Sequence, residues 1–183
     1  MKNNNVLPPH ASRTDWATWQ PTERAVLLFV IREGQILLIR KKRGLGAGKI
    51  NGPGGRIEPG ETAHEAAVRE TREELGVEAH DPELRGELHF QFLDGYALHC
   101  GVFVSPDCSG TAIETEEAIP LWTPVGEIPY SEMWADDAHW LPGTISGGTF
   151  RAFFTFDGEK MLDHHIDWTR SPAPGALESP GQG

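Results

Sequence analysis

The chain of 183 residues has few cysteines, no long apolar run and a shortage of basic residues. No stretch approaches the roughly 20 apolar residues of a membrane-spanning helix, and the first residues lack the apolar segment of a signal peptide. The two cysteines, Cys100 and Cys108, neither form a disulfide framework nor have the spacing of a metal motif. We therefore expect a cytoplasmic protein that has no membrane partner.

The charge balance is strongly acidic. Lys and Arg number 16 against 27 Asp and Glu, which gives a formal net charge of −11. This balance disfavours binding to duplex nucleic acid, because a phosphate backbone requires a basic surface. A small phosphorylated ligand is compatible with it if a bound metal ion reverses the local sign of the charge.

The length is that of a single domain with a substantial core. We expect this domain to span residues 21–168, between mobile tails of residues 1–20 and 169–183 that are rich in polar residues, Pro and Gly. Strand-like runs predict three hairpins, at residues 24–40, 87–104 and 149–168, and a short strand at residues 119–124. A short helix is expected at residues 136–141. This excess of strands predicts an α+β domain with a mixed, curved sheet and helices packed on it.

One helix is predicted in more detail. Thr62 and Glu65 form a capping box, so the helix begins at about Ala63, and Gly76 is suited to its end. Helical spacing places an apolar stripe on one face, formed by Ala67, Val68, Thr71 and Leu75. The same spacing turns Glu65, Arg69 and Arg72 to the far side.

Three acids border the apolar stripe of this helix. Glu70, Glu73 and Glu74 are three and four residues apart, so their charges repel one another. One interpretation is an ordinary solvated acidic face. The other is a site for a hard divalent cation such as Mg²⁺, which binds carboxylates and substrate phosphates. The glycine-rich loop before the helix would form the opposite side of such a site.

The segment from Gly55 through Glu61 to "RETREELGV" (residues 69–77) resembles the Nudix box, with Thr71 where the pattern has a bulky aliphatic residue. The resemblance implies an α/β/α sandwich with a loop–helix–loop. It also implies hydrolysis of a nucleoside diphosphate linked to another moiety, with Mg²⁺ or Mn²⁺ as the cofactor. The implied metal ligands are the backbone carbonyl of Gly54 and the carboxylates of Glu70, Glu73, Glu74 and Glu117. Glu61 and Arg69 are implied to form a structural salt bridge.

The hydrolysis of a phosphoanhydride needs a base that takes a proton from the attacking water. Glu74 is one candidate, because it lies closest to the border of the helix that faces the loop. Glu117, in a loop before the 119–124 strand, is the other candidate. Without the resemblance, Glu117 is equally well interpreted as an ordinary loop acid.

Two further segments, 41–61 and 128–142, resemble the Nudix enzymes that hydrolyse oxidised purine nucleoside triphosphates such as 8-oxo-dGTP. This resemblance implies release of the monophosphate and pyrophosphate, a role in nucleotide-pool sanitation and DNA repair, and a monomer or small homo-oligomer. The implied substrate contacts are Lys41, Asn51, Gly54, Gly55, Arg56, Trp134, Asp136 and Asp137.

The residue types suit a purine. Trp134 offers a flat apolar wall, and two adjacent carboxyls in a closed pocket can share one proton, so that they donate and accept. The alternative is structural: Asp136 caps the 136–141 helix and Trp134 belongs to the core.

The substrate range stays open. Four positions, Val26, Leu45, Ile50 and Leu98, carry residue types that differ from the resembled enzymes. Unmodified nucleotides, dinucleoside polyphosphates, sugar nucleotides and 5′-triphosphate RNA are therefore alternative substrates. A non-enzymatic alternative is a module that senses a nucleotide.

Overall fold

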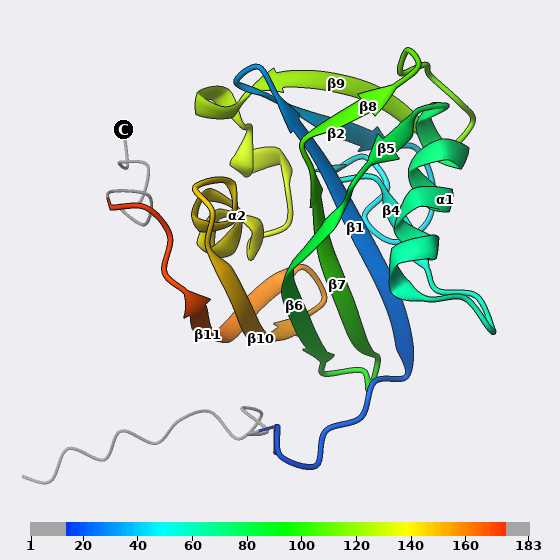
Figure 1. Ribbon diagram of the computed structural model, residues 1–183. Helices are drawn as coiled ribbons and strands as arrows, with labels where there is room; N and C mark the ends of the chain where they lie inside the picture. Colours follow the sequence, from blue (N-terminus) through cyan, green and yellow to red (C-terminus); the bar gives the residue numbers. More distant parts are fainter. Residues whose placement is uncertain (1–13, 175–183) are drawn as a thin grey trace, which may run out of the picture.

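The computed structural model describes residues 14–174 and shows a mixed sheet with one helix on each face (Figure 1). The helices are α1 (Ala63–Leu75) and α2 (Asp137–Ile145). The strands are β1 (Glu23–Arg32), β2 (Gln35–Lys41), β3 (Ile50–Asn51), β4 (Gly54–Arg56), β5 (Glu78–His80), β6 (Glu83–Phe92), β7 (Ala97–Ser105), β8 (Asp107–Ser109), β9 (Ala118–Pro124), β10 (Thr149–Asp157) and β11 (Lys160–Arg170).

The main sheet has the order β11-β10-β6-β7-β1-β2-β3, with β4 added to β1 and β9 added to β2. One edge of β1 pairs in parallel with β7 along residues 23–30. Its other edge is divided, because β4 pairs with residues 25–27 and β2 with residues 31–32. This division brings the short strand β4 against the centre of the sheet. A mixed sheet between two helices confirms the predicted α+β sandwich.

The three predicted hairpins are present as β1–β2, β6–β7 and β10–β11. The predicted start of α1 at Ala63 and the left-handed Gly76 after its end are also confirmed, and both bonds of the capping box form. The helix predicted at 136–141 begins one residue later and continues through Pro142 to Ile145, so both of its predicted ends were wrong. The small antiparallel sheet of β5 and β8 was not predicted.

Trp16 and Trp19 lie against the main sheet. Trp16 contacts the Phe153 ring at 5.1 Å, and Trp19 contacts His89 at 5.3 Å. Trp19 Nε1 donates a hydrogen bond to Gln91 Oε1 at 2.9 Å. Residues 14–20 were predicted to belong to a mobile tail, yet they include these contacts. The predicted tail residues 1–13 and 175–183 lie outside the described residues.

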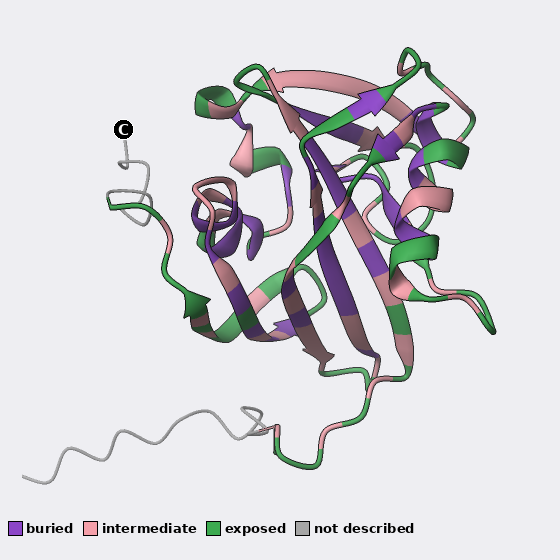
Figure 2. Cartoon of the chain, viewed as in Figure 1, coloured by how far each residue is buried: buried purple, intermediate pink, exposed green. Residues whose placement is uncertain are grey.

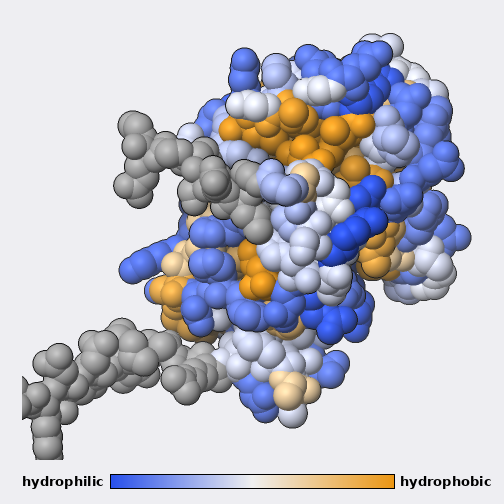
Figure 3. Space-filling view, turned by 60° about the vertical axis from the view of Figure 1, so that its left-hand side comes forward, coloured by the Kyte–Doolittle hydropathy of each residue, from blue (hydrophilic) through white to orange (hydrophobic). Residues whose placement is uncertain are grey.

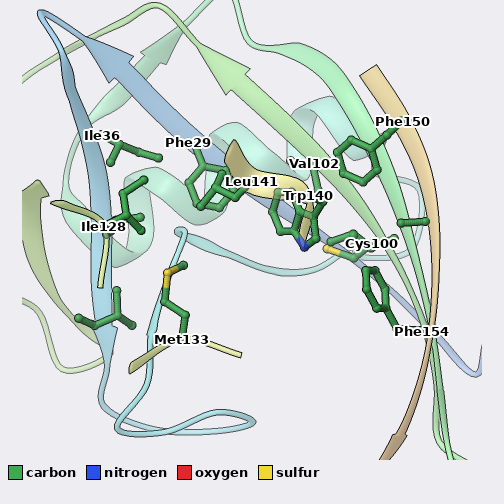
Figure 4. Packing of buried hydrophobic residues seen from close by; sticks show 14 of the residues in the cluster. Phe29, Ile36, Cys100, Val102, Ile128, Met133, Trp140, Leu141, Phe150 and Phe154 are labelled. Atoms are coloured by element: carbon green, nitrogen blue, oxygen red, sulfur yellow. The ribbon is translucent and has the colours of Figure 1, made fainter. Parts of the chain in front are cut away.

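The core has two parts, one on each face of the sheet. Alternate residues of β1 point to opposite faces, so Val26 packs beneath α1 while Phe29 packs toward α2. Figure 2 shows this alternation as purple buried bands along the central strands. On the α2 side, Trp140 contacts Phe29 and Phe150, with ring centroids 6.0 and 5.4 Å apart, and Cys100 lies beside them (Figure 4).

The surface is mainly hydrophilic, and the face shown in Figure 3 has one large group of apolar residues in its upper part and smaller groups below it. Between residues 14 and 174, no helix has the length and apolar character needed to cross a membrane.

Candidate active site

A cavity of about 320 Å³ lies on the α2 side of the sheet. Its walls come from β1, β4, β6, β7 and β10, from the glycine-rich loop after β2 and from the segment that leads into α2. The fold therefore brings together all eight substrate contacts that the resemblance implied. These are Lys41, Asn51, Gly54, Gly55, Arg56, Trp134, Asp136 and Asp137.

Two buried carboxyls stand at one end of this cavity. Asp136 and Asp137 are each only 2% exposed. Asp136 Oδ2 accepts a hydrogen bond from Trp140 Nε1 at 2.9 Å, and Asp137 Oδ2 accepts one from the Trp134 backbone N–H at 3.1 Å. The Asp136 side chain makes no capping bond to α2, which argues against the helix-cap alternative.

Burial is the main cause of a raised pKa at both aspartates, and the charge of Asp136 raises the pKa of Asp137 further. Two adjacent carboxyls without water cannot easily both ionise. The pair therefore favours a state in which one carboxyl keeps its proton, so that the pair can both donate and accept a hydrogen bond.

Aromatic side chains form the wall beside this pair. Trp134 meets Phe156 edge to face at 5.8 Å and Phe92 at 6.5 Å. The Lys49 ammonium lies 5.2 Å from the centroid of the Trp134 ring, a cation–π distance. The cavity thus has the flat apolar wall and the polar end that a purine needs.

Sequence reasoning missed several residues that line the cavity. They come from β1, β6, β7 and β10 and from the turn before β7, and no local motif marks them. They include Glu23, Phe90, Phe92, Tyr96, Cys100 and Phe156. Of the positions that differ from the resembled enzymes, Val26, Leu45 and Leu98 line the cavity, with Leu45 52% exposed, whereas Ile50 belongs to the buried core on the α2 side.

At the other end of the cavity, α1 meets β4 closely. The Gly54 backbone N–H donates to Glu74 Oε2 at 3.0 Å. A Cβ atom on Gly54 would lie 2.0 Å from the Val26 carbonyl oxygen, and one on Gly55 would lie 2.4 Å from the Glu70 carboxyl carbon. Glycine at position 54 therefore lets β4 lie against the backbone of β1, and glycine at position 55 leaves room for the Glu70 carboxylate of α1.

Arg69 does not point away from the site as predicted. Its guanidinium turns back toward the loop and is bonded to Glu61, Glu70 and Glu73 at 2.7, 2.9 and 3.1 Å. It also donates to the Arg56 carbonyl at 3.0 Å. The hydrogen bond from Arg69 lowers the pKa of Glu61 to about 2. The ion pair of Glu61 and Arg69 thus ties the loop to α1.

The acids are less closely grouped than the sequence suggested. The Glu73 side chain is 59% exposed, and Glu117 is ion-paired with Arg43. Within residues 14–174, no three acidic, His or Cys side chains are arranged as a metal-binding group. Arg43 binds the Glu117 carboxylate, whereas the Arg69 guanidinium bridges Glu70 and Glu73.

The acids nearest to β4 still suit a cation. Burial is the main cause that raises the pKa of Glu74 to about 7, and burial likewise raises the pKa of Glu70. The negative charge of Glu117 also raises the pKa of both Glu70 and Glu74, so these carboxylates lie close enough to repel one another. Desolvated carboxylates that repel one another beside a backbone strand match the oxygen ligands that Mg²⁺ prefers.

The basic run at the end of β2 divides into two roles. Lys41 lines the cavity, and its charge lowers the pKa of Glu74. Its neighbours are ion-paired with acids, since Arg40 binds Glu132 and Lys42 binds Glu114. Lys41 is thus the residue of this run that lines the cavity near Glu74.

The NUDIX domain family model matches residues 21–143. The chain belongs to the Nudix family. Members of the Nudix family generally use divalent metal ions such as Mg²⁺. The matched range contains α1, the glycine-rich loop and the Asp136–Asp137 pair, so it includes both ends of the cavity.

Curated Nudix relatives cover most of the chain. The oxidized purine nucleoside triphosphate hydrolase of Danio rerio is 36% identical over 143 residues, which are 77% of this chain and 92% of that protein. The mouse enzyme of the same description is 34% identical over 142 residues, which are 76% of this chain and 91% of that protein. The chain is thus a Nudix hydrolase with homologues among these enzymes.

The fold agrees with solved Nudix structures. A MutT protein from Bacillus halodurans superposes with a TM-score of 0.72 at 25% identity, covering 79% of this chain and 97% of that one.

Proposed function

We propose that this Nudix hydrolase is a Mg²⁺-dependent pyrophosphohydrolase of purine nucleoside triphosphates, with oxidised forms such as 8-oxo-dGTP as substrates. The products are the nucleoside monophosphate and pyrophosphate, and Mn²⁺ can replace Mg²⁺. The observation that carries the proposal is that the buried pair of Asp136 and Asp137 shares one cavity with Gly54 and Gly55 beneath α1. This activity would remove damaged nucleotides before DNA synthesis uses them.

The base end suits an oxidised purine. The edge of a guanine-type base offers both N–H donors and a carbonyl acceptor. A carboxyl pair that holds one proton can accept a hydrogen bond from the N–H groups of the base and donate one to its carbonyl. Asn51 adds an amide, and Trp134 supplies a wall for stacking. The names of the Danio rerio and mouse relatives support the same substrate class.

The phosphate end suits hydrolysis. A bound Mg²⁺ would neutralise phosphate charge and acidify water. Its proposed ligands are the Gly54 carbonyl and the carboxylates of Glu70, Glu73, Glu74 and Glu117. Glu74, with its pKa raised to about 7, is suited to take a proton from the attacking water. Glu117 is the alternative base, and Lys41 and Arg56 would bind phosphate oxygens.

One feature favours a wider range of bases. Leu45 stands half exposed at the cavity, where the resembled enzymes have an aromatic residue. An aliphatic side chain gives less stacking area than an aromatic ring. Unmodified purine nucleotides are therefore a second group of candidate substrates.

Replacing each aspartate separately tests the base end. Asp136→Asn and Asp137→Asn should change the ranking of kcat/KM among 8-oxo-dGTP, 2-hydroxy-dATP, dGTP and dATP. Each substitution replaces an acceptor or a proton with an amide, and a lost hydrogen bond in a buried site costs about 1–3 kcal/mol, roughly ten- to a hundredfold in discrimination. Dependence on Mg²⁺ should stay unchanged.

Asp163→Asn, on the exposed strand β11, is the matched control and should leave the ranking unchanged. A uniform fall for all four substrates in both pocket variants, together with a loss of thermal stability, would show that the pair is structural. The proposed substrate class would then lose its main support.

A further inference from the structure

Glu23, Tyr96 and Arg56 form a polar cluster that lines the cavity and has no role in the proposed base reading. The Tyr96 hydroxyl donates a hydrogen bond to the Glu23 carboxylate, which is also ion-paired with Arg56. Burial raises the pKa of Tyr96, so its hydroxyl remains a donor. The Glu23 side chain is 19% exposed, whereas that of Arg56 is 79% exposed. Glu23 is therefore the shielded member of the pair.

This cluster lies between the two ends of the cavity. Arg56 directly follows Gly54 and Gly55 on β4, at the phosphate end. Tyr96 contacts Phe92 with ring centroids 5.5 Å apart, and Phe92 in turn contacts Trp134 at the base end. The sugar of a nucleotide lies between its base and its phosphates. The position of Glu23 and Tyr96 is therefore the place that the sugar would occupy.

We propose that Glu23 accepts a hydrogen bond from a sugar hydroxyl of the nucleotide, with Tyr96 holding the carboxylate in position. This inference rests on the proposed function. A carboxylate has about four lone-pair sites, so the contacts with Tyr96 and Arg56 leave capacity for a further donor. A hydroxyl presented by the sugar is a donor of the right kind. Glu23 is thus a specificity-determining residue for the sugar, apart from the base and the metal.

A merely structural role makes a different prediction. Glu23 opens β1 and Tyr96 precedes β7, and these strands pair with each other, so their hydrogen bond could simply join two strand ends. Loss of that tie would lower stability and slow all substrates by one factor. Recognition of the sugar instead changes the ratio between substrates that differ in their hydroxyls.

The test keeps the guanine base constant and varies the sugar. The value of kcat/KM is measured for GTP, 2′-deoxy-GTP, 3′-deoxy-GTP and 2′,3′-dideoxy-GTP with Mg²⁺. The parent should lose about tenfold or more between GTP and the dideoxy form, and the two monodeoxy forms identify which hydroxyl is bound. In Glu23→Ala this ratio should fall toward one. Glu23→Gln should keep part of it, because the amide oxygen still accepts.

Glu87→Ala is the matched control, since Glu87 is also a strand glutamate paired with an arginine, Arg151, but does not line the cavity. It should keep the parental ratio. A parental ratio in Glu23→Ala, or a parent that treats all four sugars alike, would overturn the inference while the base ranking stands. A parent that hydrolyses none of these nucleotides nor 8-oxo-dGTP would overturn the proposed function as well.

Discussion

The Glu70 carboxyl group stands 2.4 Å from where the Cβ atom of any residue other than glycine at position 55 would lie. Position 55 does not require glycine for a left-handed backbone, because its φ angle is not positive. Glycine is required at position 55 because the end of the Glu70 side chain, which extends from α1 to β4, occupies the space of a Cβ atom.

Gly55→Ala should therefore lower activity more than stability. The methyl group meets the end of a flexible glutamate, which can move aside at a cost of about 1 kcal/mol. The moved carboxylate would no longer serve as a proposed metal ligand, so kcat should fall at least tenfold. Thermal unfolding and initial rates measure the two effects.

Gly54→Ala is the contrasting variant, because its methyl group would lie 2.0 Å from the backbone oxygen of Val26. Backbone in a central strand cannot move aside as a side chain can, so this variant should be strongly destabilised. Equal stability losses in the two variants would show that the Glu70 contact is as rigid as the strand.

Glu74→Gln should keep the fold and lose turnover. The amide has nearly the same shape, and its oxygen still accepts the hydrogen bond from Gly54 N–H. Loss of a general base alone lowers rates by about 10²–10⁴-fold. The measurement is kcat at saturating Mg²⁺ together with the melting temperature.

Glu78→Gln is a suitable control for this change, because Glu78 is ion-paired with Arg72 outside the cavity. It should keep the parental turnover. Near-parental turnover in Glu74→Gln would show that Glu74 neither takes the proton nor binds the metal.

The stability of the protein should depend on the pH through the Asp136–Asp137 pair. Burial raises the pKa of both groups above the ordinary value, so folding favours the protonated form. The stability from these groups is present at low pH and is lost as the pH rises through their raised pKa values. Each unit of raised pKa corresponds to about 1.4 kcal/mol.

Asp137→Asn removes one of these titrations. The free energy of unfolding of the variant, relative to the parent, should therefore increase from about pH 4 to pH 8. Urea denaturation at several pH values measures this difference, with Asp163→Asn as the exposed control. A difference that is constant across this range would mean that the pair keeps ordinary pKa values.

Local sequence signals predicted the elements well. The capping box at Thr62 gave the start of α1, and glycine turns between apolar runs gave the three hairpins. The strands β5 and β8 have three residues each, too few for a periodic pattern to emerge. The packing of Trp16 and Trp19 depends on the sheet that they meet, and their own segment gives no sign of it.

Candidate site residues were visible in the sequence where they lie in one short motif, and were hidden where the fold brings together residues from distant segments. Asp136 and Asp137 are adjacent in the sequence, so their pairing was visible. The direction of Arg69 was wrong, because helical spacing ignores the loop whose acid Glu61 draws the guanidinium back. Glu23 and Tyr96 meet only through the pairing of β1 with β7, which no local pattern reveals.

Product analysis on four nucleotides with Mg²⁺ tests the proposed pyrophosphohydrolase activity. Purified protein is incubated with 8-oxo-dGTP, 2-hydroxy-dATP, dGTP and dATP, and the phosphorus-containing products are separated and quantified. We expect the nucleoside monophosphate and pyrophosphate in equal amounts, with a higher kcat/KM for at least one oxidised base than for its normal counterpart. Release of orthophosphate, or no hydrolysis of any of the four, would contradict the proposed activity.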